Sequence, residues 1–185
     1  MALAVLAASA GSARVFLSLD EALDLAFPEC SVERASAYLS EAEMTAVTET
    51  AGSRPETAIV HPYTATCGDR PGGTAYFDVH RVRTLPETLM VVVSPDGTVG
   101  RVELLSFREP PDYIPRAGWY DQFDHQALDE DLALKRDIRP VTGATLTARA
   151  TTDAVRRVLA IHRLLAERET KERSRAAAPE EDGSR

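Results

Sequence analysis

The sequence lacks the cysteine and histidine patterns that hold metals or haem. Its two cysteines, Cys30 and Cys67, lie far apart and outside any Cys-x-x-Cys motif, which argues against a zinc site and against c-type haem attachment. The four histidines show no ligand spacing, so we expect no metal site. They are His61, His80, His125 and His162, of which His61 and His80 are expected on strands as half-buried or exposed side chains.

An excess of positive charge is also absent. The formal net charge is −8 and the isoelectric point is about 5.0, which argues against a nucleic-acid partner because phosphate backbones require a basic surface. No Gly-x-Gly-x-x-Gly motif follows a predicted strand, so we do not expect direct oxidation of NADH by this chain. No Ser/His/Asp set and no pair of carboxylates indicates a hydrolase, and we assign no catalytic residue.

What is present is sufficient for one domain with a sizeable core. The chain has 185 residues, 44% of them hydrophobic, which allows a core and some unstructured sequence at the ends. The cysteines leave two interpretations open. Cys30 and Cys67 form a disulfide if the compartment is oxidising, or they are two unpaired buried thiols.

Residues 1–13, MALAVLAASAGSA, resemble the end of a secretory signal peptide, with Ala8-Ser9-Ala10 as the cleavage pattern. The positively charged segment that normally precedes the apolar run is missing. A second interpretation is therefore an apolar N-terminal segment that stays attached as a weak anchor. The run is shorter than the ~20 apolar residues that a membrane-spanning helix needs.

Residues 14–57 predict a helical region, because two capping boxes mark the starts of helices. Ser18 with Glu21 forms the first box, and Ser40 with Glu43 forms the second. In each box the serine accepts from the first turn and the glutamate reaches back to the serine N–H.

Residues 58–166 predict a domain of several strands followed by one long helix. A turn at Ser94–Gly97 joins two of the strands and predicts an antiparallel meander. After Thr147 an apolar stripe with helical spacing predicts a helix packed on the sheet, formed by Ala154, Val155, Val158, Ile161 and Leu165. Residues 167–185 have no apolar period and predict a disordered charged tail.

Small and hydroxylated residues precede the long helix, in the run Thr142-Gly143-Ala144-Thr145-Leu146-Thr147. The first N–H groups of a helix have no intrahelical partners and carry the positive end of its dipole. The run therefore predicts a seat for an anionic group such as a phosphate. The alternative interpretation is ordinary helix capping, which requires no ligand.

This run resembles the [ST]-G-A-T-x-[ST] motif of FMN-binding domains, found in flavin subunits of sodium-translocating NADH:quinone reductases, Rnf-type complexes and related extracytoplasmic proteins. In that family a flavin transferase joins the FMN phosphate to a threonine through a phosphoester, and the matching residue is Thr145. The resemblance implies FMN binding by Thr142, Gly143, Ala144, Thr145, Leu146 and Thr147. One position departs from the motif, because Arg139 stands where the family usually has an acid for recognition by the transferase. This departure bears more on covalent attachment than on flavin binding.

A second segment is similar to the same family. Ser106 to Tyr113 contains a Glu-x-Pro core, and a tryptophan follows downstream. The resemblance implies that Glu109, Pro110 and Trp119 lie near the isoalloxazine ring and that the loop 83–88, including Thr88, borders the flavin pocket. The alternatives are that Trp119 and Phe123 are core residues and that the loop is a plain connection.

Taken together, the resemblance implies an α+β fold, with an antiparallel sheet packed against helices and FMN as cofactor. The implied function is that of an extracytoplasmic electron carrier, periplasmic or membrane-associated. Its partners would be redox donor and acceptor proteins or a membrane electron-transport complex, and a flavin transferase if the FMN is covalent. One alternative, which Arg139 favours, is a non-redox FMN- or phosphate-binding sensory or interaction module without covalent flavin. Another is a flavin enzyme with its own small-molecule substrate.

Overall fold

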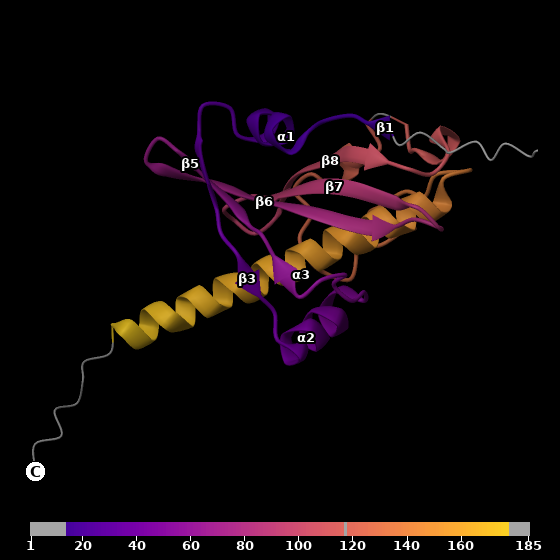
Figure 1. The fold of residues 1–185 in the computed structure, drawn as a ribbon. Helices are drawn as coiled ribbons and strands as arrows, with labels where there is room; N and C mark the ends of the chain where they lie inside the picture. The colour runs from indigo at the N-terminus through magenta and orange to yellow at the C-terminus, as the bar shows by residue number, and fades with distance from the viewer. Residues whose placement is uncertain (1–13, 117, 178–185) are drawn as a thin grey trace, which may run out of the picture.

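The centre of the molecule is a six-stranded antiparallel sheet (Figure 1), seen in a computed structural model that describes residues 14–116 and 118–177. The strand order is β1-β8-β7-β6-β5-β2, and two short strands, β3 and β4, pair separately. The bounds are β1 Arg14–Val15, β2 Ser31–Arg34, β3 Ala37–Tyr38, β4 Ile59–Val60, β5 Tyr63–Cys67, β6 Arg70–Arg81, β7 Pro86–Val93 and β8 Val99–Phe107. The predicted α+β class is confirmed.

The three longest strands form the predicted meander. Val91 of β7 pairs with Tyr76 of β6 on one side and with Val102 of β8 on the other. The tight turn between β7 and β8 is closed by the Ser94 N–H, which donates to the Thr98 carbonyl at 2.8 Å, and Gly97 adopts a φ of 84° there. That φ suits glycine, which has no Cβ to clash in the left-handed region.

Among residues 14–116 and 118–177, three α-helices and two short 3₁₀-helices complete the fold. They are α1 Leu19–Ala26, α2 Glu41–Ala51, η1 Pro111–Tyr113, η2 Tyr120–Phe123 and α3 Thr145–Ala176. Both predicted capping boxes are present. The Ser18 N–H donates to the Glu21 carboxylate at 2.8 Å while the Ser18 hydroxyl accepts from the Glu21 N–H, and Ser40 with Glu43 repeats this geometry at α2.

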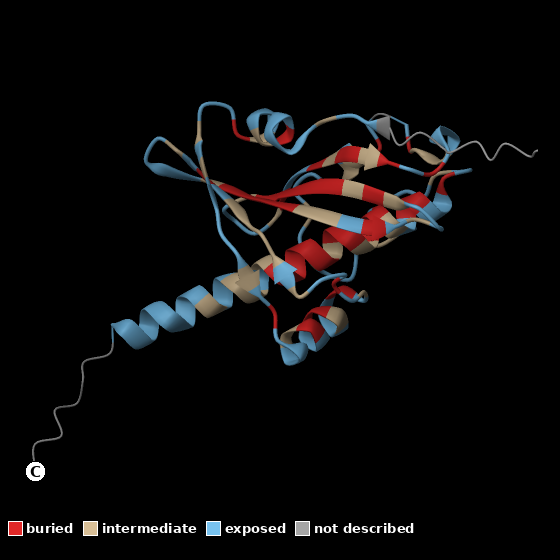
Figure 2. Ribbon diagram, viewed as in Figure 1, coloured by how far each residue is buried: buried red, intermediate tan, exposed pale blue. Residues whose placement is uncertain are grey.

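β7 is buried along most of its length (Figure 2), because neighbouring residues on both faces of the sheet are covered. Leu89, Val91 and Val93 of β7 belong to the larger core, together with buried residues of α2 and α3. Met90 and Val92 point the opposite way, toward the smaller core beneath α1. Helices therefore cover the sheet on both faces. Residues 14–57 supply β1 and β2 to the same sheet and are more than a helical region.

The last helix extends further than the sequence indicates. α3 continues to Ala176, so the prediction of a disordered tail from residue 167 is wrong for residues 167–176. Its exposed end carries i,i+4 ion pairs such as Arg173 with Glu169, and Arg168 pairs with Glu43 of α2. Such pairs add helix stability without an apolar stripe. The predicted signal segment 1–13 and the remaining tail residues lie outside the described residues.

No helix within the described ranges has an apolar stretch long enough to cross a membrane.

Cys30 and Cys67 form a disulfide, which decides between the two interpretations that the sequence leaves open. The bond joins the segment between α1 and β2 to the end of β5, across a separation of 37 residues. Closing a loop of this length removes conformational freedom from the unfolded chain.

We therefore expect Cys30→Ala to lower the free energy of unfolding by about 2–4 kcal/mol. Urea denaturation monitored by circular dichroism measures the change. Dithiothreitol should destabilise the wild-type protein by a similar amount and leave the Cys30→Ala/Cys67→Ala variant unaffected. Equal stability of wild type and variant under oxidising conditions would show that the cross-link is not formed in solution.

Candidate functional site

The start of α3 has no side-chain cap, in contrast to α1 and α2. Ala144 is the N-cap residue, and the first intrahelical bond runs from the Ala148 N–H to the Ala144 carbonyl at 2.9 Å. The N–H groups of the first turn, residues 145–147, therefore have no intrahelical acceptor. Gly143 precedes them with a φ of 86°, and a Cβ added there would meet no atom within 4 Å. The positive φ therefore explains why glycine is favoured at this position, since the surrounding structure has room for a side chain.

A pocket of about 170 Å³ opens at this helix start. It is lined by residues 143–147 and, opposite them, by Arg83 and Tyr113. The Thr147 hydroxyl donates to the Tyr113 carbonyl at 2.7 Å and fixes η1 against the helix. The guanidinium carbon of Arg83 lies 5.2 Å from the centre of the Tyr113 ring, a cation–π distance. The pocket lining thus combines N–H donors, hydroxyls and one cation, with no carboxylate.

Thr145 is exposed at the mouth of this pocket. Its hydroxyl donates to the Val141 carbonyl at 3.1 Å and has no other protein partner in the described structure. Thr142 is exposed as well but does not line the pocket, whereas Gly143, Ala144, Leu146 and Thr147 do.

Glu109 holds the loop that carries Arg83. Its Oε1 accepts from the Thr84 N–H at 2.7 Å, from the Leu85 N–H at 2.8 Å and from the Thr84 hydroxyl at 3.2 Å. These hydrogen bonds, led by the one from the Thr84 backbone, lower the pKa of the Glu109 carboxyl although its side chain is buried. Arg81 donates to the Thr84 carbonyl at 2.7 Å and secures the loop from the other side. The carboxylate therefore positions the pocket wall.

Three other predicted cofactor residues do not line this pocket. Trp119 is 8% exposed and packs edge-to-face with Phe123 in the core. Its indole N–H donates to the Arg139 carbonyl at 2.7 Å, which ties down the chain before Pro140. Thr88 accepts from the Ser106 hydroxyl at 2.9 Å, and Pro110 is exposed at the start of η1. This arrangement favours the core interpretation of Trp119 over a flavin contact.

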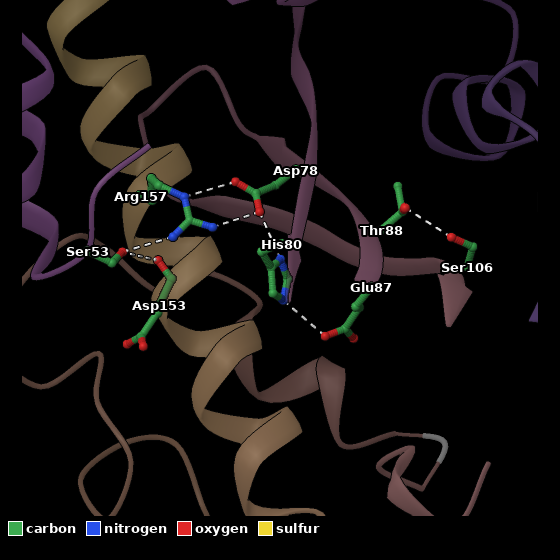
Figure 3. A network of polar contacts seen from close by, with 8 residues as sticks. All are labelled: Ser53, Asp78, His80, Glu87, Thr88, Ser106, Asp153 and Arg157. Atoms are coloured by element: carbon green, nitrogen blue, oxygen red, sulfur yellow. Dashed lines mark hydrogen bonds and ion pairs between the residues drawn. The ribbon is translucent and has the colours of Figure 1, made fainter. Parts of the chain in front are cut away.

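A buried charge network that no sequence motif predicted joins α3 to the sheet (Figure 3). Arg157 of α3 donates to both carboxylate oxygens of Asp78, at 2.7 and 3.1 Å. His80 lies between two carboxylates, with Nδ1 at 2.8 Å from Asp78 and Nε2 at 3.1 Å from Glu87. His80 is only 5% exposed, so the expectation of a half-buried or exposed histidine is wrong.

The sequence carries a signal for only part of the network, the i, i+2 spacing of Asp78 and His80, whereas the contact with Glu87 depends on strand register. Asp78 and His80 share one face of β6 by the period of two, and His80 pairs directly with Glu87 of β7. Burial alone would lower the pKa of His80, but the hydrogen bonds to Asp78 and Glu87 raise it to about 9. The imidazolium therefore links β6 and β7, while Arg157 links β6 to α3.

Residues 85–160 match the model of a protein family described as the FMN-binding domain. The chain contains an FMN-binding domain. The match covers Glu109, Trp119 and the start of α3, so the predicted family and its cofactor, FMN, are confirmed. A comparison with curated proteins finds no match.

The pocket at the start of α3 suits the FMN phosphate. A phosphate dianion accepts several hydrogen bonds and favours the positive end of a helix dipole. The pocket offers the N–H groups of the first turn, the Thr145 hydroxyl and the guanidinium of Arg83. Arg83 lies just outside the matched residues and was not among the predicted site residues, although the loop that contains it was.

We expect Glu109→Ala to weaken FMN binding about tenfold, a loss of roughly 1.4 kcal/mol, because the loop carrying Arg83 loses its anchor. Titration of flavin fluorescence against the apoprotein measures the dissociation constant. Glu109→Gln is the matched control, since its amide oxygen still accepts from the Thr84 N–H, and it should lose less affinity. Unchanged affinity in Glu109→Ala would contradict the positioning role.

The buried network predicts a pH dependence of stability. The folded-state pKa of His80 is raised from 6.5 to about 9, so its contribution is fully present below pH 6.5 and is lost as the pH rises through 9. The free energy of unfolding should fall by about 3 kcal/mol across this window, since each pKa unit corresponds to about 1.4 kcal/mol. Denaturant titrations at several pH values test this, and His80→Gln should show a flatter profile. A wild-type profile that rises between pH 6.5 and 9 would refute the charged state of His80.

Proposed function

We propose that this chain is an extracytoplasmic electron carrier that holds FMN by its phosphate at the start of α3. The observation that carries the proposal is the uncapped first turn, which faces Arg83 across a pocket free of carboxylates. Bound FMN supplies reversible electron transfer, and the protein supplies position, burial and tuning of the potential. Gly143 lets the backbone approach the phosphate, while Tyr113 and Leu146 offer apolar surface beside it.

We also propose that Thr145 carries the FMN covalently. Its hydroxyl is exposed, so a flavin transferase can reach it. The linkage forms a bond from Oγ1 to the phosphorus of an activated FMN ester, and the hydroxyl proton and the leaving group on phosphorus depart. The product is heavier than the polypeptide by one FMN less one water. A covalent link prevents loss of the cofactor where FMN is not replenished.

Two observations support placement outside the cytoplasm. The Cys30–Cys67 disulfide suits an oxidising compartment, where such bonds persist. The N-terminal sequence resembles a secretory signal. In that compartment the partners of the FMN-binding domain would be donor and acceptor proteins or a membrane electron-transport complex.

The alternative is a non-redox FMN-binding module without covalent flavin, and Arg139 is the feature that favours it. Its N–H donates to Gln122 at 2.9 Å and its carbonyl accepts from Trp119, so the backbone is fixed while the side chain stays exposed. An exposed, fixed position is where a transferase would recognise the chain, and a cation there replaces the family's acid.

Intact-mass spectrometry of protein produced together with a flavin transferase tests the linkage. We expect a mass increase of one FMN less water, a yellow colour, and complete loss of the increase in Thr145→Val. Thr142→Val, which changes an exposed threonine outside the pocket, should keep it. Persistence of the increase in Thr145→Val would place the ester elsewhere. Yellow protein without any increase would support the non-covalent alternative.

A further inference from the structure

Exposed arginines are concentrated in the segments that lie at the pocket end of this acidic chain. Three segments meet at the end of the sheet where α3 begins, namely residues 81–86, 107–116 and 139–149. Together they contain six arginines and two acidic residues, although the whole chain has a net charge of −8. We call the exposed side chains of these six residues the arginine face; they are Arg81, Arg83, Arg108, Arg116, Arg139 and Arg149.

The topology brings the three segments together. β6 ends and β7 begins here, with Arg81 paired to Pro86, and β8 ends here, with the Arg108 N–H donating to the Pro86 carbonyl at 3.1 Å. α3 begins at the same end (Figure 1), where its hydrogen bond from Thr147 reaches Tyr113. The segments that carry the arginine face therefore lie at the end of the sheet where the pocket opens, and Arg83 lines the pocket itself.

None of the six guanidinium groups lies within ion-pair distance of a carboxylate in the described part of the chain. Arginines elsewhere do form such pairs, including Arg54 with Glu41, Arg157 with Asp78 and Arg168 with Glu43. Of the two acids in the three segments, Glu109 is buried in the loop anchor, and only Asp112 is exposed. The groove that holds Arg81 and Arg149 is also lined by Glu56 and Asp153, which offset part of the charge.

The positive charge exceeds what the cofactor requires. FMN has one phosphate, and the N–H groups of α3 with Arg83 already face the place proposed for it. Unpaired like charges held close together destabilise a fold, so a cluster of this kind indicates a second anionic ligand. Leu85 and Leu146, which belong to two of these segments, are 39% and 48% exposed, so the segments offer apolar surface as well as positive charge.

We propose that the arginine face is the docking surface for an acidic partner protein that exchanges electrons with the flavin. This inference rests on the proposed function. A compact partner protein would contact only the end of the domain that carries these arginines. Because the Debye length is about 8 Å at physiological salt, the charge near the contact affects binding more than the net charge of the whole chain. A long anionic polymer or an anionic membrane would extend over the acidic remainder of the surface and meet repulsion.

The first test measures the field at the flavin with small redox probes. Reduced, FMN-loaded protein is mixed in stopped flow with ferricyanide, a trianion that takes one electron per ion, at increasing ionic strength. The proposal predicts that the rate falls with salt, although the net charge of −8 alone would make it rise. Hexaammineruthenium(III), a trication, should show the opposite trend. A ferricyanide rate that increases with salt overturns the proposal.

Charge-reversal variants locate the effect. Arg108→Glu/Arg149→Glu should slow ferricyanide reoxidation about tenfold at low ionic strength and weaken its salt dependence. Arg34→Glu/Arg70→Glu, which makes the same change in net charge on exposed arginines at the end of β2 and at the far end of β6, is the control and should change the rate less than twofold. Equal effects of the two double variants overturn the assignment to the arginine face.

A second test does not depend on flavin. Binding of a short acidic peptide, hexaglutamate, to the flavin-free protein at low salt should be lost in Arg108→Glu/Arg149→Glu and retained in the control. If this result holds while the protein fails to bind FMN, the proposed function falls and the anion-binding face stands. No binding by the wild type overturns the inference. Cosedimentation with phosphatidylglycerol vesicles that depends on the same arginines would assign the face to a membrane and overturn the protein partner.

Discussion

The unpaired N–H groups in the first turn of α3 are the constraint on which the site depends. Four donors at a helix start normally find a cap, and the capping boxes of α1 and α2 supply one from the local sequence. α3 begins after Gly143 and Ala144, which have no side chain able to cap it. Its donors are therefore available to an external acceptor, and the FMN-binding domain match includes this turn.

The surrounding contacts keep that turn accessible and fixed. Thr147 ties the helix to η1, Glu109 ties the loop of Arg83 to the end of β8, and Trp119 ties the preceding segment through the Arg139 carbonyl. Each is a hydrogen bond between residues far apart in sequence. The geometry of the pocket therefore depends on the loops at one end of the sheet as well as on α3.

The charges of the molecule are divided between two roles. Under α3, the ionic groups of Asp78, His80, Glu87 and Arg157 contact one another and join the helix to the sheet. Such a buried network is costly to break, because removal of one member leaves an uncompensated charge. At the pocket end the arginines are exposed and unpaired within the described residues, so their charge remains available to ligands.

Local patterns predicted the elements whose causes are local. The two capping boxes, the turn at Ser94–Gly97 and the helix that begins at Thr145 all follow from residues within a few positions of one another. The α+β class follows from strand alternation together with the family resemblance. The tail is the exception, since i,i+4 ion pairs extend α3 to Ala176 where no apolar period exists.

Features that depend on register or on long-range contact could not be predicted from the sequence. The anchor role of Glu109 requires that the end of β8 lie beside the loop at Thr84, and the contact of Arg83 with the pocket follows from it. The His80 network depends on the pairing of β6 with β7. A motif can name Glu109 and Trp119 as site residues, but only the fold distinguishes a residue that contacts a ligand from one that positions its pocket.

The central claim is that the phosphate of FMN binds at the first turn of α3. Two-dimensional NMR of ¹⁵N-labelled apoprotein tests this most directly, with FMN and riboflavin added in parallel. The account predicts large shifts of the Gly143, Leu146 and Thr147 amide resonances with FMN and small ones with riboflavin, which lacks the phosphate. Equal shifts with both ligands, or shifts confined to amides elsewhere, would contradict it.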